Sequence, residues 1–498
     1  MDERAGDRQV DAWDALRGLS LALDLVMGRR SGHAQATAAL GLMVGRRLGL
    51  PADELADIAL TALLKDAGCA ASRPAFTVAV GTDDVAFHRH VFAMERYSPA
   101  TFAALLWDLQ RRQSDKATRR AWGWTNALLG LRNYQQQFAA RNAEAARLAD
   151  QLRCPIGTIG AIAAVGEHWD GSGNPGKLSG TAIPIAARIV TATQLATVWG
   201  EEFSSAIVAE RLAPQAGARL DPAVVAALQA ILIGLPPLAA GEWLDPLTVD
   251  LAVGESPLRE AQSLTAPLLA GVFADIVDAK STFTAQHSHR VSALAGAMAQ
   301  LAGALPADVE EVLLAGLLHD LGKLGVSNLV LDKNGPLDAT EWTSMRRHPA
   351  DSAHVLRMIP GWESITTWAA AHHERPDGRG YHLQREGETI PLVGRWLAVA
   401  DAFDAMTADL PYREGLPRWR RCADCARGGV PNSIMKRCCS SPRSWKAGRY
   451  RAVWRIRLPP PLRQSWLLLP LHCPPLLTPP LLPCRCEPHA RADNAVPA

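Results

Sequence analysis

The sequence predicts an all-α protein with two helical bundles in tandem, followed by a largely unstructured C-terminal tail. Three observations support this prediction. Apolar residues recur at three- and four-residue spacing through most of the first 416 residues, and β-branched runs are short. Two sets of motifs occur twice, in the same order. In addition, 14 of the 34 prolines lie in residues 416–498, where they interrupt any helix.

The first bundle is predicted to span residues 10–235 and the second residues 263–416. Helical runs in both are broken by glycine and proline, and Pro51 stands at a favoured first helical position before an apolar run. Between the bundles, residues 236–262 contain four prolines and two glycines. We therefore expect this segment to be a connector.

The two bundles share motifs at constant offsets. A histidine at the start of a helix is followed 33 positions later by an aspartate, and this pair recurs 254 positions further on. An Asp-Gly-x-Gly motif followed by Ile-Pro also recurs, 207 positions further on. Three motifs in the same order indicate two copies of one helical domain. The matched residues are His33 with His287, Asp66 with Asp320, and Asp170 with Asp377.

Five histidines and two aspartates of the second copy are attached to helical runs whose other positions are apolar. Burying so many polar groups without partners would cost several kcal/mol for each charged group. A shared metal site removes this cost, and histidine with aspartate suits iron, manganese or zinc better than calcium or magnesium. The candidate ligands are His287, His319, Asp320, His348, His372, His373 and Asp401.

The motifs around these residues form a specific set. They read His287-Ser-His-Arg-Val, His319-Asp-Leu-Gly-Lys323, His348-Pro349, His372-His-Glu-Arg-Pro-Asp-Gly-Arg-Gly-Tyr381 and Asp401. Over roughly residues 275–415, this set resembles the HD-GYP branch of the HD-domain phosphohydrolases. The resemblance implies a helical, metal-dependent phosphodiesterase that holds two or three metals, commonly iron or manganese, and hydrolyses cyclic di-GMP.

The resemblance also implies a role for each residue. One metal would be held by His287, His319, Asp320 and Asp401, and the other by His348, His372 and His373, with Asp320 bridging. A hydroxide between the metals would attack phosphorus in line. Asp320 and Lys323 would be the catalytic residues, and the substrate would contact Lys323, Asp377, Tyr381 and Arg413.

The chain departs from the family pattern at four places. Phe283 replaces the carboxylate of a third metal, so we expect two divalent transition metals, iron or manganese. The family's Gly-Tyr-Pro reads Gly-Tyr-His, ending at His382, and its Arg-Pro-Tyr-Arg reads Leu-Pro-Tyr-Arg, beginning at Leu410. The closing helices are replaced by the tail. These changes keep open an alternative function, a catalytically weak signalling scaffold that binds nucleotide or a protein partner.

The first copy lacks most of the site. Lys65 stands at the position of His319, and only His33 and Asp66 remain of the seven ligands. We therefore interpret this copy as degenerate, with a structural or regulatory role. The positions equivalent to the other four ligands are occupied by Arg141, Val165, Gly166 and Gln194.

Composition predicts a cytoplasmic protein. Outside the tail there are only two cysteines, Cys69 and Cys154, as in proteins of a reducing compartment. The N-terminus is charged and lacks the apolar run of a secretory signal. Prolines interrupt the most apolar segment, residues 466–482, so no transmembrane helix is expected. The resemblance implies a cyclic dinucleotide as the substrate partner, and it leaves a homodimer or a signalling partner as further alternatives.

The tail, residues 417–498, allows two interpretations. Residues 416–498 hold 15 Lys and Arg against 3 Asp and Glu, a balance typical of binding to nucleic acid or an anionic membrane. The same segment is rich in Pro, Cys and Arg and has no periodicity, as in GC-rich coding read in another frame. We favour a disordered or frame-shifted segment and expect no nucleic-acid partner. No correctly spaced second pair follows Cys422 and Cys425, so no zinc knuckle is predicted.

Overall fold

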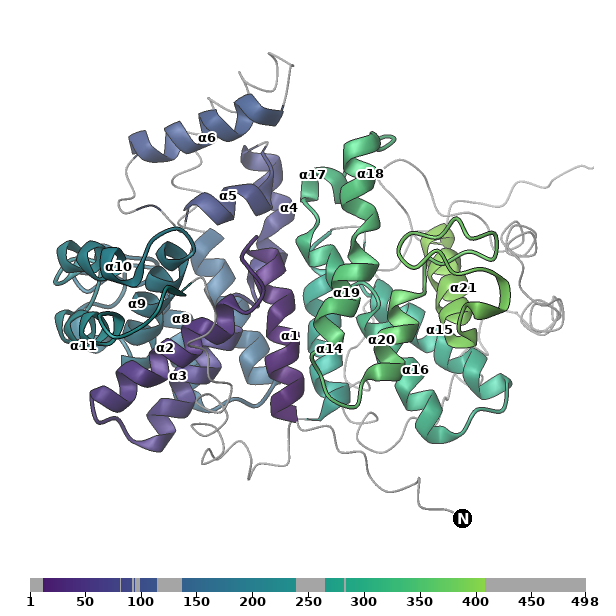
Figure 1. Cartoon of the computed structure of the whole chain (residues 1–498), viewed down its shortest axis with the longest axis horizontal. Helices are drawn as coiled ribbons and strands as arrows, with labels where there is room; N and C mark the ends of the chain where they lie inside the picture. Colours follow the sequence, from purple (N-terminus) through teal and green to yellow (C-terminus); the bar gives the residue numbers. More distant parts are fainter. Residues whose placement is uncertain are drawn as a thin grey trace, which may run out of the picture. The chain divides into compact units, whose positions relative to one another are not determined.

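Helices make up the regular structure of this protein. The structure is a computed structural model (Figure 1), and it describes residues 12–80, 82–91, 94, 99–113, 137–238, 265–281 and 284–407. Within these ranges there are α-helices, short 3-10 helices and two isolated β-bridges, and no β-strand. The all-α prediction is confirmed. The tail and most of the predicted connector lie outside the described residues.

The first bundle is coloured purple to teal in Figure 1. Its long helices present apolar faces to a common core, and α9 is buried along almost its whole length. The helices are α1 (Ala12–Val26), α2 (His33–Arg47), α3 (Ala52–Leu64), α4 (Cys69–Val80), α5 (Asp84–Val91), α6 (Pro99–Gln113), α8 (Ile156–Ala164), η1 (Gly180–Ala182), α9 (Ile185–Gly200), α10 (Ser205–Leu212), η2 (Ala213–Gln215) and α11 (Pro222–Leu232).

The second bundle is coloured green to yellow-green (Figure 1). In it, α15 packs against α16 and α21, and α20 contacts α16, α19 and α21. The elements are α14 (Ala266–Asp278), α15 (His287–Leu301), α16 (Pro306–Leu318), η4 (Leu321–Gly325), α17 (Asn328–Leu331), α18 (Ala339–Arg346), α19 (His348–Leu356), α20 (Glu363–Ala370), η5 (Gly387–Thr389) and α21 (Leu392–Thr407).

The helix boundaries reproduce the sequence repeat. Both ends of α2 and of α3 match the ends of α15 and α16 at the offset of 254 positions. Both ends of α9 match those of α21 at the offset of 207 positions. The 3-10 helices η1 and η5 obey the second offset as well. The longer first copy accommodates its extra residues between these matched sets, where α4, α5 and α6 lie. The prediction of two bundles of one type is therefore confirmed, while their exact bounds stay predictions.

Equivalent buried carboxylates fix the start of helix α2 in the first copy and of helix α15 in the second. In the first copy, Asp24 accepts a hydrogen bond from the backbone N–H of Ala34 at 3.0 Å. In the second, Asp278 accepts from the backbone N–H of Ser288 at 3.1 Å. The two acceptors and the two donors are each related by the first offset of the repeat. The carboxylates satisfy N–H groups that the first helical turn leaves without a partner, which holds the histidine at the start of each helix at the same place in its bundle.

Among the described residues, no helix combines the length and the apolar content that crossing a membrane requires.

Candidate metal centre

Helix ends bring the predicted ligands of the second copy together. Two histidines are the first residues of their helices, two residues follow the end of α16, two more follow the end of α20, and one lies within α21. Helix packing therefore collects side chains that are distant in sequence. In that order, they are His287 and His348, His319 and Asp320, His372 and His373, and Asp401.

Backbone carbonyls set the tautomer of three histidines. In His319, His348 and His372, the Nδ1 atom lies 2.5–2.8 Å from the carbonyl oxygen three residues earlier. A carbonyl oxygen only accepts, so Nδ1 carries the proton and donates it. The Nε2 lone pair of each ring is then free for a metal, and the hydrogen bond on the other nitrogen fixes the ring orientation.

Asp320 lies between two sets of imidazole nitrogens. Its Oδ2 atom is 3.4 Å from Nε2 of His287 and 3.3 Å from Nε2 of His319. Its Oδ1 atom is 3.3 Å from Nε2 of His348 and 3.7 Å from Nε2 of His372. One oxygen therefore faces each set. A carboxylate in this position can bridge two cations.

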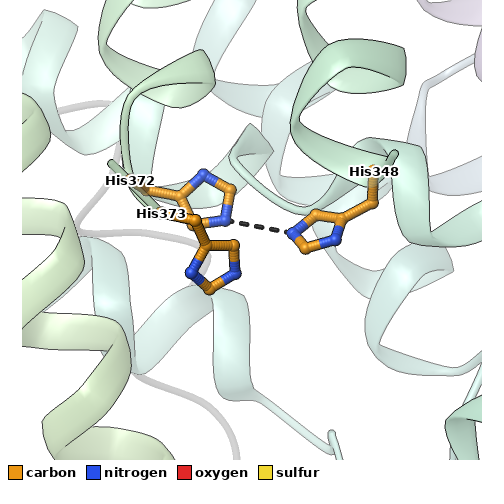
Figure 2. Close-up of side chains that lie close together, drawn as sticks. All are labelled: His348, His372 and His373. Carbon is orange, nitrogen blue, oxygen red and sulfur yellow. Dashed lines mark hydrogen bonds between the residues drawn. The ribbon is translucent and has the colours of Figure 1, made fainter. Parts of the chain in front are cut away.

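The two sets are compact enough to hold one ion each. Within each set, one ligand atom per residue lies within 4.8 Å of the others. Figure 2 shows the second set, in which adjacent histidines of one segment approach a histidine of another; the dashed line joins the Nε2 atoms of His348 and His372, which lie 3.2 Å apart. The sets are His287, His319 and Asp401, and His348, His372 and His373.

The buried polar atoms of the site fit a cation. Nε2 of His287, Nε2 of His319 and Oδ1 of Asp320 are buried and have no hydrogen-bond partner among the described residues. Burial lowers the pKa of His287, but the neighbouring carboxylates of Asp320, Asp401 and Asp404 raise it to about 11. The carboxylates thus favour a positive charge at this place. Imidazole nitrogens with carboxylate oxygens are donors that suit iron, manganese and zinc.

Asp404 was missed by the sequence reasoning. Its Oδ2 atom accepts a hydrogen bond from Nδ1 of His287 at 2.8 Å, and Arg290 donates to both of its oxygens. The carboxylate therefore orients His287 from outside the ligand set. A signal existed, because Asp404 lies one helical turn after Asp401 on the same helix.

Glu374 is a second residue that the sequence reasoning missed. Its buried carboxylate accepts backbone N–H bonds from His382, Leu383 and Arg385, at 2.7–3.1 Å, and so fixes the loop that carries Tyr381. The repeat contained the signal. Glu167, which corresponds to Glu374 by the second offset, accepts equivalent bonds from three backbone N–H groups of the first copy.

The substrate-binding residues expected from sequence lie in different surroundings. The Lys323 ammonium donates to Oδ2 of Asp320 and so contacts the metal centre directly. Asp377 is exposed and pairs with Arg375 at 2.7 Å, while accepting a bond from the backbone N–H of Arg379. These contacts make Asp377 a turn-forming residue, and its contact with substrate stays a prediction.

Tyr381 lies beside the second ligand set. The centre of its ring is 4.6 Å from that of His373, so it borders the metal centre. Arg413, Leu410 and Phe283 lie outside the described residues, and the expectations attached to them stay predictions.

The first copy has an ion pair where the second has ligands. The Lys65 ammonium lies 2.5 Å from Oδ2 of Asp66, and both side chains are buried. His33 is also buried, and its Nε2 has no hydrogen-bond partner among the described residues. Arg141 is buried at the position equivalent to His348. Two cationic side chains thus occupy positions that are candidate metal ligands in the second copy.

Comparisons with known proteins agree with this geometry. The family model described as HD domain matches residues 271–420. The chain is 32% identical, over 406 residues, to the 3'3'-cGAMP-specific phosphodiesterase 3 of Vibrio cholerae, covering 80% of this chain and 87% of that protein. It is 40% identical over 136 residues to a cyclic di-GMP phosphodiesterase of Pseudomonas aeruginosa, covering 27% of this chain and 32% of that protein.

A solved structure is similar to most of the chain. The crystal structure of the cyclic GMP-AMP specific phosphodiesterase V-cGAP3 of V. cholerae matches with a TM-score of 0.57 and 25% identity. The match covers 86% of this chain and 96% of the other. Because this coverage is far larger than the second bundle alone, the similarity includes the first bundle.

Proposed function

The chain belongs to the HD-GYP family of HD-domain hydrolases, and from this premise we propose that it is a metal-dependent phosphodiesterase that cleaves a cyclic dinucleotide. The relatives that match over 115 to 146 residues are named either for cyclic di-GMP, the substrate expected from sequence, or for 3'3'-cGAMP. The relative that spans both bundles is named for 3'3'-cGAMP. This wider match favours 3'3'-cGAMP as the preferred substrate, with cyclic di-GMP second.

The position of Asp320 carries the proposal. Its two oxygens face two separate groups of ligand nitrogens, which supports a centre of two divalent ions, iron or manganese, bridged by this carboxylate. Lewis acidity toward phosphate oxygens and an activated water are the chemistry that such a pair supplies when bound. His287, His319 and Asp401 would hold one ion, and His348, His372 and His373 the other.

The side chains around the centre position the substrate and stabilise charge. Burial lowers the pKa of Lys323, but the carboxylates of Asp320 and Asp401 raise it above its ordinary value, so the ammonium stays protonated. A protonated lysine at this place can stabilise the negative charge that develops on a phosphate during cleavage. Asp404 holds His287 in orientation, and Glu374 holds the loop of Tyr381.

The proposal is tested by turnover of the full chain after loading with manganese or iron(II). We expect the chain to hydrolyse 3'3'-cGAMP and cyclic di-GMP. Chromatography of the products measures this turnover. Asp320→Asn should lower kcat by about three orders of magnitude, since several kcal/mol of charge stabilisation depend on the bridging carboxylate. The control is Lys65→Met with Asp66→Asn, which changes the equivalent position of the first copy and should leave kcat unchanged.

The same assay distinguishes the proposed function from the alternative function, a signalling scaffold. Metal-loaded, folded protein that cleaves no cyclic dinucleotide would contradict the proposal and favour a signalling scaffold. An equal loss of kcat in Asp320→Asn and in the first-copy control, with folding preserved, would contradict the assignment of the site to the second copy.

A further inference from the structure

Helix α18 presents an aromatic ring and a guanidinium at the edge of the metal centre. Trp342 is 39% exposed although it is a large apolar side chain. Arg346, one turn later, places its guanidinium carbon 5.5 Å from the centre of the Trp342 ring and 5.6 Å from that of the Tyr381 ring. The two rings lie 6.3 Å apart and nearly perpendicular, at 73°. Together they hold the guanidinium in one place.

This cluster is connected to the ligands by two routes. Through side chains, Tyr381 contacts both Trp342 and His373, with ring centres 6.3 and 4.6 Å apart. Through the backbone, the carbonyl of Met345 accepts the Nδ1 proton of His348 at 2.7 Å. The helix that carries the cluster therefore also orients a ligand. The Trp342 ring therefore lies on an element that contacts two of the candidate ligands, His348 and, through Tyr381, His373.

The guanidinium of Arg346 is available to a ligand. No carboxylate of the described residues lies within ion-pair distance of it, and it makes no hydrogen bond to them. Nearby arginines differ, because Arg347 pairs with Asp351 and Arg375 pairs with Asp377. An exposed arginine that aromatic rings hold in place, with free N–H donors, is suited to planar acceptors such as the edge of a purine.

We propose that Trp342, Arg346 and Tyr381 form a subsite for one purine base of the substrate, and that Arg346 selects guanine. The inference rests on the proposed function and deepens it. A base stacks on the exposed Trp342 ring, while Arg346 donates two hydrogen bonds to O6 and N7, which are acceptors in guanine. In adenine an amino group replaces O6, so Arg346 loses one of its two bonds.

The test compares substrates with and without a base. Manganese-loaded full chain is assayed with 3'3'-cGAMP, cyclic di-GMP, cyclic di-AMP and bis(p-nitrophenyl) phosphate, a phosphodiester that has no purine. Trp342→Ala should raise KM for cyclic di-GMP about tenfold, or about 1.4 kcal/mol, with kcat within about twofold. Arg346→Met should raise KM about tenfold for cyclic di-GMP but much less for cyclic di-AMP. Both variants should affect the base-free substrate far less.

Matched variants separate recognition from folding. Arg347→Met changes the neighbouring exposed arginine, which directly follows α18, and Trp107→Ala changes a tryptophan of similar exposure, 45%, in the first bundle. Both should leave KM unchanged. Trp342→Phe keeps a stacking ring and should restore most of the affinity, which rules out a general loss of structure. Thermal unfolding of each variant verifies the folded fraction.

The outcomes distinguish two failures. If the wild-type chain cleaves cyclic di-GMP and both variants leave its KM within twofold, the subsite is wrong while the proposed function stands. A parallel loss with bis(p-nitrophenyl) phosphate would also contradict the subsite, because the effect would then act on the metal centre. If the wild type cleaves only the base-free substrate, the proposed function is wrong and the subsite with it.

Discussion

The buried ion pair of the first copy gives the sharpest prediction of stability. Lys65 and Asp66 are 1% and 3% exposed, and their charged atoms are 2.5 Å apart. Burial by itself raises the pKa of Asp66, but Lys65 and Arg141 lower it below its ordinary value. The Lys65 ammonium thus neutralises the Asp66 carboxylate, as a metal ion would do at the equivalent position of the second copy. We expect Lys65→Met and Asp66→Asn each to leave one buried charge without its main partner.

The size of the effect follows from the burial. Removing one partner of a buried pair costs about 3–5 kcal/mol, a large part of the roughly 5–15 kcal/mol that stabilises a folded domain. Replacing both partners with neutral side chains of similar volume removes the uncompensated charge. The double variant Lys65→Met with Asp66→Asn should therefore lose less than about 2 kcal/mol, and less than either single variant.

The assay is equilibrium unfolding in urea, followed by circular dichroism, with metal-loaded protein and all four members of the double-mutant cycle. A coupling energy of about 3 kcal/mol or more is expected. Additive losses would refute the reasoning, because they would show that the two side chains do not compensate each other. Retained turnover in the double variant is expected in the same samples, since we assign catalysis to the second copy.

Two further predictions concern other buried carboxylates. Glu374→Gln should raise KM for the cyclic dinucleotide about tenfold, because the three backbone hydrogen bonds of Glu374 fix the loop of Tyr381. The matched variant Glu167→Gln in the first copy should leave KM unchanged. Steady-state kinetics measures both variants. Burial raises the pKa of Asp24 from 3.8 to about 7, so the folded state binds more protons than the unfolded chain between these values. Stability should therefore fall by on the order of 3 kcal/mol as pH rises from about 4 to 7, and Asp24→Asn should lose this slope in urea unfolding at pH 4.5, 6 and 8.

Much of the fold was predictable because the chain contains the domain twice. The two constant offsets, read from three motifs, reproduce the bounds of whole helices, such as α3 with α16 and α9 with α21. The motifs also identified side chains that the structure brings together around Asp320. Helix periodicity and a repeat are local or self-similar signals, so one sequence is enough to see them.

Asp404, one of the residues that sequence reasoning missed, acts through a long-range hydrogen bond. His287 and Asp404 are 117 residues apart, and no local period connects them. The same holds for the pairing of Trp342 with Tyr381, which depends on where a loop returns to α18. Such contacts depend on the direction of side chains at helix ends, and the spacing of residues along the chain does not determine that direction.

The first copy packs against the second through a buried carboxylate. Asp84 of α5 is fully buried and accepts hydrogen bonds from Nζ of Lys280 at 3.0 Å, from the hydroxyl of Ser327 at 3.0 Å and from the backbone N–H of Asn328 at 2.8 Å. Burial raises the pKa of Asp84, but Lys280 and Arg73 lower it below its ordinary value, so the carboxylate is charged.

These contacts join the first bundle to segments on both sides of the metal centre. Lys280 follows α14 and precedes the helix of His287, while Ser327 and Asn328 follow η4, the short helix of Lys323. Helix α1 of the first bundle also packs against η4, α14 and α19. A charged ammonium at Lys280 would lose its main compensating charge in its buried position without Asp84. The first copy therefore packs against the elements that carry the candidate ligands, and these contacts stabilise the position of those elements.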